Sequence, residues 1–164
     1  MRIGIISDTH DHQRSVRQAV KVFKTHGVEC VLHAGDITGP STITLFSELP
    51  GSRVIAVCGN CDSERLSLRA AVEAIGGEIH DRIFTGQLDD RMVYMTHIPN
   101  GLDQVIRDGQ YDLVVYGHTH QQDIRRIGQT LMVNPGSARS WMGQPAHVAI
   151  VDLDDMTVTT EPLE

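Results

Sequence analysis

Five short apolar runs in this chain have the length and composition of β-strands, and each is followed within a few residues by a side chain that can bind a metal ion. The runs cover residues 3–6, 31–34, 54–57, 92–95 and 113–116. Ligands of a wound α/β sheet bind in the crevice beyond the carboxyl ends of its strands. We therefore expect the following nitrogen and oxygen ligands to converge on one edge: Asp8, His10, Asp36, Asn60, His97, His118 and His120.

The length of the chain suits one domain, residues 1–164, with a sizeable buried core. The chain has 14 lysine and arginine residues against 21 aspartate and glutamate residues, a formal net charge of −7. Such a protein repels polyanions, so we do not expect it to bind long nucleic acids. The apolar run at the N-terminus is too short for a signal segment or a membrane span, and we expect a cytoplasmic protein without membrane contact.

Three cysteines do not close a disulfide framework, and a reducing compartment fits them better. Cys58 and Cys61 have C-x-x-C spacing, but Gly59-Asn60 between them indicates a loop rather than the start of a thioredoxin-like helix. One such pair supplies half of a structural zinc site. A redox or structural-zinc role is kept as an alternative, and it predicts metal or thiol chemistry that survives Asp36→Ala.

Apolar residues at helical spacing predict helices between the strands. The pattern before Gly27 predicts a helix over residues 13–26, and similar patterns cover residues 66–75 and 102–106. From about residue 78 the chain changes to short strands and turns. The first half is therefore of the βαβ type and the second is largely β, which two sheets packed face to face with helices outside would accommodate.

Small and polar residues mark the turns of the second half. Gly86 and Asp89-Asp90 indicate one turn, Gly128-Gln129 a second, and Asn134-Pro135-Gly136 a third.

The spacing of the candidate ligands suits two metal ions. Asp8 and His10 lie two residues apart, so one cation can bind both if the strand direction persists. Asp36 follows Gly35, where backbone and ligand can approach closely, and its two carboxylate oxygens can bridge two cations. His118 and His120 repeat the two-residue spacing with two imidazoles, which could point one nitrogen at each of two metal ions.

The mixture of imidazole and carboxylate favours Mn, Fe, Co, Ni or Zn over Ca or Mg. Each candidate also has an ordinary interpretation. Asn60 beside Gly59 suits a turn, His97 can end a strand, and residues 118–120 can form a surface loop. Their joint position at strand ends favours the metal site.

The motifs Asp8-x-His10, Gly35-Asp36, Gly59-Asn60-x-Asp62, His97 and Gly117-His118-x-His120 together resemble the signature of the calcineurin-like metallophosphoesterases. The short chain, the form Gly59-Asn60-Cys61-Asp62 and residues 134–137 narrow the resemblance to the small bacterial and archaeal phosphodiesterase branch, the YfcE-like group. The resemblance implies a four-layer αββα sandwich with a dinuclear centre. It assigns Asp8, His10 and His120 to one metal, Asn60, His97 and His118 to the other, and Asp36 to both.

By this resemblance the protein is a phosphodiesterase in which a metal-bridging hydroxide attacks a small phosphodiester. We expect two divalent ions, with Mn favoured and Ni, Fe, Co or Zn as alternatives. Together they would carry four positive charges. Two aspartates and a hydroxide remove three of these and leave an anion-binding centre of about +1.

Cys61 departs from the family pattern, which usually has a histidine between the asparagine and the aspartate. A thiol is a poorer proton donor than imidazole for a departing alkoxide, so we expect diesters with good leaving groups to react best. Cys61 and Asp62 are our candidate catalytic residues, with Asp62 orienting the loop by hydrogen bonds. His12 and Arg139 are candidate substrate-binding residues, although a solvent-facing helix entry explains His12 better and an exposed structural arginine explains Arg139 at least as well.

A non-catalytic binding scaffold is the alternative function, since a retromer subunit resembles the same family. Retention of metal-competent side chains at all candidate positions argues against it. Loops 11–15, 98–104 and 138–145 are expected to hold substrate specificity, and Trp141 with Met142 offers a possible contact in a homo-oligomer.

Overall fold

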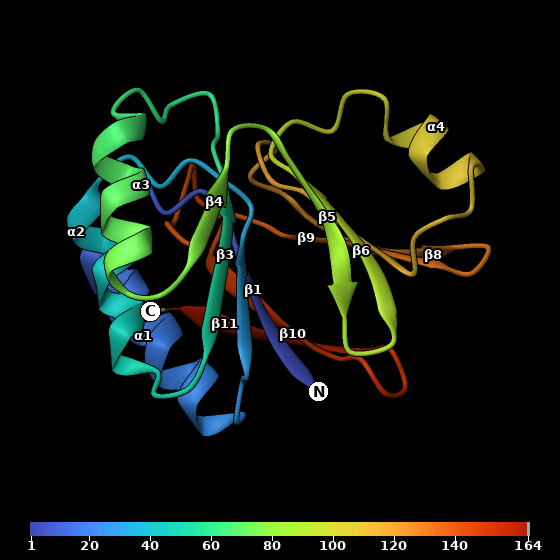
Figure 1. Ribbon diagram of the computed structural model, residues 1–164, viewed down its shortest axis with the longest axis horizontal. Coiled ribbons are helices and arrows are strands. Elements are labelled where there is room, and N and C mark those ends of the chain that lie inside the picture. Colours follow the sequence, from blue (N-terminus) through green and yellow to red (C-terminus); the bar gives the residue numbers. More distant parts are fainter. Residues whose placement is uncertain (164) are drawn as a thin grey trace.

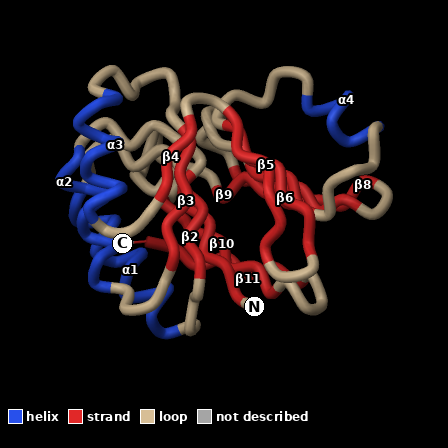
Figure 2. Tube along the Cα trace, viewed as in Figure 1, coloured by secondary structure: helices blue, strands red, loops and turns tan. Residues whose placement is uncertain are grey.

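The computed structural model describes residues 1–163, which form two β-sheets packed face to face with helices outside (Figures 1 and 2). The first sheet has the strand order β11-β10-β1-β2-β3-β4. Its strands are β1 Arg2–Ile6, β2 Cys30–His33, β3 Arg53–Val57, β4 Glu78–His80, β10 Ala146–Asp152 and β11 Thr157–Leu163. Strands β1 to β4 are parallel, whereas β10 and β11 pair antiparallel.

The second sheet has the order β5-β6-β7-β9-β8. Its strands are β5 Ile83–Leu88, β6 Arg91–Thr96, β7 Leu113–Val115, β8 Gln122–Ile127 and β9 Thr130–Pro135. β6, β7 and β9 are parallel to one another, and the outer strands β5 and β8 pair antiparallel.

Alternation along β1 explains how the sheets are covered. Ile3 and Ile5 face the second sheet and pack in a core with Met95 and Val115, whereas Ile6 faces the helices. The helices on that outer face are α1 Gln13–Thr25, α2 Pro40–Ile43, the 3-10 helix η1 Thr44–Glu48 and α3 Arg65–Ala74.

The outer face of the second sheet is covered by one short helix, α4 Leu102–Arg107. Leu102 packs there with Val114, Tyr116 and Met132. The four-layer αββα sandwich predicted from the resemblance is therefore confirmed, with a much thinner helical layer on the second sheet than on the first (Figure 1).

The predicted helices are present, but two turn predictions were wrong. Gly86 lies inside β5, where the Phe84 ring covers it, and Asp89-Asp90 alone form the turn to β6. Asn134 and Pro135 are the last residues of β9, and the chain bends at Gly136, which has a φ of 84°. Glycine or proline in a strand is tolerated at such positions because a neighbour fills the space or the strand ends.

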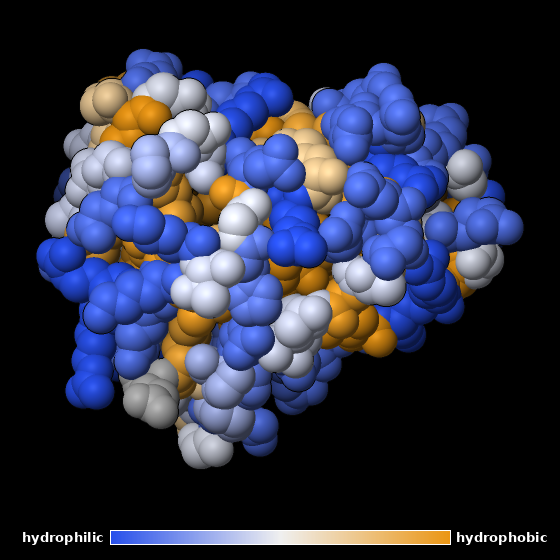
Figure 3. Space-filling view, turned by 90° about the horizontal axis from the view of Figure 1, so that it is seen from below, coloured by the Kyte–Doolittle hydropathy of each residue, from blue (hydrophilic) through white to orange (hydrophobic). Residues whose placement is uncertain are grey.

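Among the described residues, no helix is both long and apolar enough to cross a membrane. Seen from below the view of Figure 1, the surface is mostly hydrophilic, with apolar atoms in separate small areas (Figure 3).

Candidate metal centre

The turns that follow β1, β2, β3, β6 and β7 bring the predicted ligands together. Three of these strands belong to the first sheet and two to the second, so the expected single edge is in fact two adjoining edges. The side chains that meet there are Asp8, His10, Asp36, Asn60, His97, His118 and His120.

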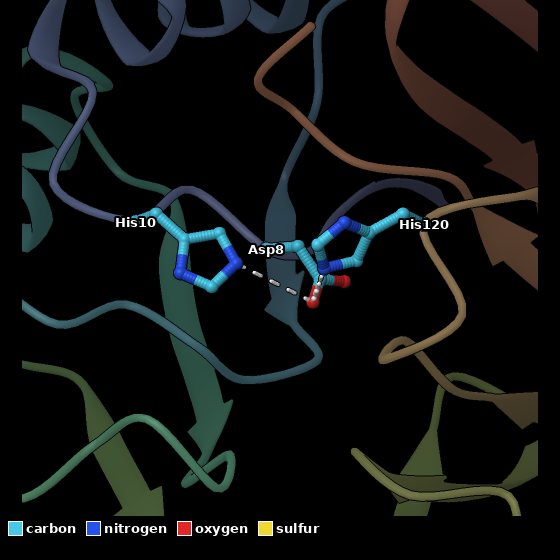
Figure 4. Close-up of side chains that lie close together, drawn as sticks. All are labelled: Asp8, His10 and His120. Atoms are coloured by element: carbon cyan, nitrogen blue, oxygen red, sulfur yellow. Dashed lines mark ion pairs between the residues drawn. The ribbon is translucent and has the colours of Figure 1, made fainter. Parts of the chain in front are cut away.

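One group, which we call the Asp8 cluster, consists of Asp8, His10 and His120 (Figure 4). Asp8 Oδ1 lies 3.2 Å from His120 Nε2 and 3.9 Å from His10 Nε2. The other carboxylate oxygen is fixed, because Ser7 Oγ donates to Asp8 Oδ2 at 2.6 Å and the His118 backbone N–H donates to it at 3.1 Å. The free oxygen is thereby held toward two ring nitrogens.

Two buried atoms of the Asp8 cluster, Asp8 Oδ1 and His10 Nε2, have no hydrogen-bond partner among the described residues. Leaving a buried polar group unpaired costs about 1–3 kcal/mol. A carboxylate oxygen and an imidazole nitrogen that face one another are both good ligands for a divalent transition metal. The geometry of the cluster therefore fits a bound cation.

A second group, the Asp36 cluster, consists of Asp36, Asn60, His97 and His118. Asp36 Oδ1 lies 3.4 Å from His97 Nε2, and Asp36 Oδ2 lies 3.7 Å from His10 Nε2 in the first group. Asn60 Oδ1 lies 3.0 Å from His97 Nε2, and the His97 and His118 rings are 5.2 Å apart. The two oxygens of Asp36 thus face the two clusters separately.

Hydrogen bonds hold the loop of the Asp36 cluster in place. The Asp62 carboxylate accepts from the backbone N–H groups of Gly59 and Thr38, both at 2.7 Å, and the Cys61 N–H donates to Asp36 Oδ1 at 2.8 Å. A Cβ on Gly59 would lie 2.1 Å from Asp36 Oδ1, so only glycine allows this approach. The Asp62 carboxylate thereby links the Gly59 turn to the backbone at Thr38.

The backbone of the turn that follows β2 orients the His97 ring. Its Nδ1 lies 2.7 Å from the carbonyl oxygen of Ala34, which can only accept a hydrogen bond, so Nδ1 carries a proton. This leaves Nε2 facing the cluster. Metal-binding histidines commonly have such a partner on the other ring nitrogen.

The two aspartates differ in their acidity. Burial raises the pKa of Asp8, and the hydrogen bond from Ser7 and the nearby histidines offset this only in part. Burial also acts to raise the pKa of Asp36, but hydrogen bonds from His97 and the Cys61 N–H outweigh it and hold that pKa well below its usual range. The charged form of Asp36 is therefore stabilised by the protein, and that of Asp8 is not.

The backbone of the site contains many residues in the left-handed region. Non-glycine residues avoid positive φ, and aspartate and histidine are among the side chains that tolerate it better. The candidate ligands with positive φ are Asp8 (54°), His10 (43°), Asp36 (55°), His118 (69°) and His120 (58°). Such strained positions concentrate at functional sites.

Some supporting residues were missed by sequence reasoning. Asn134, predicted only as a turn residue, is buried, and its Nδ2 donates to the Gly117 carbonyl at 3.1 Å and to Thr119 Oγ1 at 2.9 Å. It thereby fixes the loop that contains His118 and His120. The signal available in the sequence was its place at the end of an apolar strand, as for the ligands themselves. The exposed Trp141 ring lies edge-on to His120, with ring centroids 5.1 Å apart.

The cysteines carry no disulfide in the described residues. Burial, followed by the hydrogen bond to Asp36 and the charge of that carboxylate, raises the pKa of Cys61 to about 11, and burial also raises the pKa of Cys58. Both are thiols at neutral pH, which does not favour redox chemistry. Cys61 Sγ lies within 4.8 Å of the ligand atoms of His10 and Asp36, at the exposed mouth of the site.

His12 and Arg139 lie outside the two clusters. Both are exposed and line a separate hollow of about 210 Å³ with Arg14, and His12 Nδ1 lies 2.7 Å from Ser15 Oγ. Among the described residues, neither side chain forms a hydrogen bond or an ion pair with a candidate ligand.

Known proteins of this architecture match nearly the whole chain. A solved archaeal phosphodiesterase superposes with a TM-score of 0.93 at 33% identity, covering 99% of this chain and 100% of that one. Vps29 of Entamoeba histolytica, in a structure determined with zinc, has a TM-score of 0.62 at 20% identity, covering 99% of this chain and 98% of that one. At this identity, Vps29 shows only the shared fold.

Sequence comparison gives the same relationship. Phosphodiesterase MJ0936 of Methanocaldococcus jannaschii is 35% identical over 157 residues, covering 94% of each chain. Phosphodiesterase YfcE of Escherichia coli is 27% identical over 177 residues, covering 96% of this chain and 91% of its own. The profile of the calcineurin-like phosphoesterase superfamily domain matches residues 1–156. The chain belongs to the calcineurin-like phosphoesterase superfamily.

Proposed function

We propose that this protein is a metal-dependent phosphodiesterase, built as one domain over residues 1–164, that hydrolyses small phosphodiesters at a dinuclear centre. The observation that carries the proposal is the pair of buried atoms without partners, Asp8 Oδ1 and His10 Nε2, among side chains that are all metal-competent. The names of the relatives MJ0936 and YfcE support the reaction class.

In this proposal the two clusters bind one ion each. The Asp8 cluster would hold the first ion, and Asn60, His97 and His118 would hold the second. Asp36 would contact both, which its two separately directed oxygens support. When bound, two such ions lower the pKa of a water and neutralise phosphoryl oxygens during in-line displacement.

The residues of the chain then have distinct tasks. The buried carboxylates of Asp8 and Asp36 would attract the cations. The bound cations would in turn attract an anionic substrate to a protein whose net charge otherwise repels anions. Asp62 and the Ala34 carbonyl keep the loop and the His97 ring in their orientation. Mn is the ion we favour, with Ni, Fe, Co and Zn as alternatives that suit the same donor set.

Cys61 is proposed to face the departing group. A thiol with a pKa of about 11 stays protonated at neutral pH and is a weak hydrogen-bond donor. Esters with good leaving groups need little protonation, so we expect them to be the better substrates. His12 and Arg139 would contact a substrate only if it extends from the centre to their hollow.

A binding scaffold is the second candidate, because the fold is shared with Vps29. Seven metal-competent side chains lie close together in this protein, and an interaction surface alone does not require them. The discriminating property is turnover in the presence of metal.

The experiment is hydrolysis of bis(p-nitrophenyl) phosphate and p-nitrophenyl phosphate by chelator-stripped protein, with Mn²⁺, Ni²⁺, Zn²⁺ or Mg²⁺ added back. Metal-dependent cleavage that favours the diester is expected. If two ions bind per chain and neither ester is cleaved with any metal, the phosphodiesterase proposal is wrong and the scaffold becomes the better explanation.

A further inference from the structure

A cavity of about 400 Å³ opens directly beside the Asp36 cluster. Asn60 and His97 form part of its wall, and it extends to Arg65, Arg82 and Tyr94. Cavities of this size accommodate small ligands. One arm of a phosphodiester bound at the centre can therefore enter it.

The cavity is built where the two sheets adjoin. Arg65 is the first residue of α3, which covers the first sheet, and Arg82 lies in the short connection from β4 to β5. Tyr94 belongs to β6 of the second sheet. The connection from β4 to β5 crosses from one sheet to the other at the top of Figure 1.

The charge of the cavity is positive, unlike that of the whole protein. Among residues 1–163, neither the Arg65 side chain nor the Arg82 side chain forms an ion pair or a hydrogen bond. The acidic residue in the wall, Asp81, is already paired, since Arg69 Nη2 lies 3.2 Å from its Oδ1. Two guanidinium groups thus remain free, and this group binds phosphate or carboxylate through paired hydrogen bonds.

Apolar side chains line the same wall as the two arginines. Ile83 and Ile98 are 47% and 36% exposed and add apolar surface to the wall. Tyr94 adds an aromatic ring. The wall therefore suits an arm with an apolar or planar part followed by an anionic group.

We propose that this cavity binds a second anionic group, a phosphate or a carboxylate, on one arm of the phosphodiester substrate. The inference rests on the proposed function and narrows its substrate class. It names Arg65 and Arg82 as specificity-determining residues.

A matched pair of chromogenic diesters tests the inference. Thymidine 5′-(p-nitrophenyl phosphate) and its 3′-phosphorylated form both react by addition of water to phosphorus and release of p-nitrophenol. They differ by one phosphate on the retained arm. We expect kcat/KM to be about tenfold higher for the 3′-phosphorylated probe, since each charge-assisted hydrogen bond contributes on this scale.

The double variant R65Q/R82Q is expected to lose that preference, so that the ratio of the two kcat/KM values falls to about one. The ratio is measured in one preparation, so partial misfolding does not alter it. Arg107→Gln is the control, because Arg107 ends α4 outside the cavity and should keep the ratio.

The outcomes separate the two proposals. If neither probe is cleaved with any metal, the phosphodiesterase proposal fails and the inference fails with it. If the unphosphorylated probe is cleaved but the added phosphate brings no preference, the inference alone is wrong. A preference that survives in R65Q/R82Q also overturns it, because the attraction then comes from the metal centre.

Discussion

Asp8 and Asp36 are both buried carboxylates within reach of histidine rings, but their surroundings differ. In the Asp8 cluster, Asp8 Oδ1 and His10 Nε2 lack partners among the described residues. In the Asp36 cluster, the carboxylate accepts a backbone hydrogen bond, and His97 contacts both Asn60 and the Ala34 carbonyl. The protein itself satisfies the second group, whereas the first keeps two buried atoms without a hydrogen-bond partner.

This difference teaches how one site can combine two kinds of ligand positioning. Hydrogen bonds prearrange the Asp36 cluster, and a cation entering it would replace some of them, such as the contact between His97 Nε2 and Asn60 Oδ1. The Asp8 cluster is held mainly through the second oxygen of its carboxylate and through its loops. Each of the following experiments tests whether the two clusters behave as separate units.

The largest effect is expected for Asp36→Ala, which removes the carboxylate whose two oxygens lie toward His97 and His10. Loss of a residue that merely supports a ligand lowers metal affinity about 10- to 100-fold, so loss of this ligand should exceed that. We expect both ions to bind more weakly and hydrolysis to fall at least about a hundredfold. Metal content per chain and diester turnover measure this, with Asp90→Ala in an exposed turn as control. Two bound ions and full turnover in Asp36→Ala would remove Asp36 from the bridging position.

A smaller effect, confined to one cluster, is expected from the supporting residues. Ser7→Ala removes one of the two donors to Asp8 Oδ2, and Asp62→Ala removes the acceptor for two backbone N–H groups near Asp36. We expect each to weaken one of the two ions by about 10- to 100-fold and leave the other. Competitive metal titration resolves the two affinities, and Ser63→Ala on the exposed surface is the control. Equal weakening of both ions by either variant would mean that the clusters are not separate.

The pKa directions predict opposite effects on the metal-free protein. Asp8 has a raised pKa, so its charge opposes folding at neutral pH, and Asp8→Asn should increase the free energy of unfolding. Asp36 has a lowered pKa, so its charge favours folding above the unfolded-state pKa, and this contribution is lost as the pH falls. Asp36→Asn should therefore decrease the free energy of unfolding. Changes of about 1 kcal/mol are expected in urea denaturation at pH 7 with chelator. The same sign for both variants would contradict the comparison.

The smallest effect is expected for Cys61→His, at the mouth of the site. Imidazole is a better-matched proton donor than a thiol with a pKa of about 11. We expect a several-fold gain for esters with poor leaving groups and little gain for p-nitrophenyl esters. Cys61→Ser, which keeps a small neutral donor, is the control. Unchanged activity toward both kinds of ester would show that position 61 does not contact the leaving group.

The sequence predicted the fold well because its signals are periodic. Helix α1 has apolar side chains only on the face that packs on the first sheet, so its existence and extent could be inferred. Gly86 was wrongly predicted to lie in a turn. It lies in β5, where the Phe84 ring occupies the space of a side chain, and sequence spacing does not reveal this contact.

The candidate ligands could be predicted because each follows a strand, but their support could not. The left-handed backbone at Asp36 and His118 depends on loops from different sheets, and no local pattern specifies it. Asn134 looked like a turn residue because Pro135 and Gly136 follow it, and its hydrogen bonds to the loop of His118 appear only in three dimensions.

The strand order of the first sheet also determines when the protein can fold during its synthesis. β1, Arg2–Ile6, is made well before β10, Ala146–Asp152, with which one of its edges pairs. Until then β1 has an open edge, and open edges invite pairing with other chains. The ligand set is likewise incomplete until residue 120 has been made. Ribosome-bound chains that end before residue 146 should therefore aggregate more readily than chains that include β10.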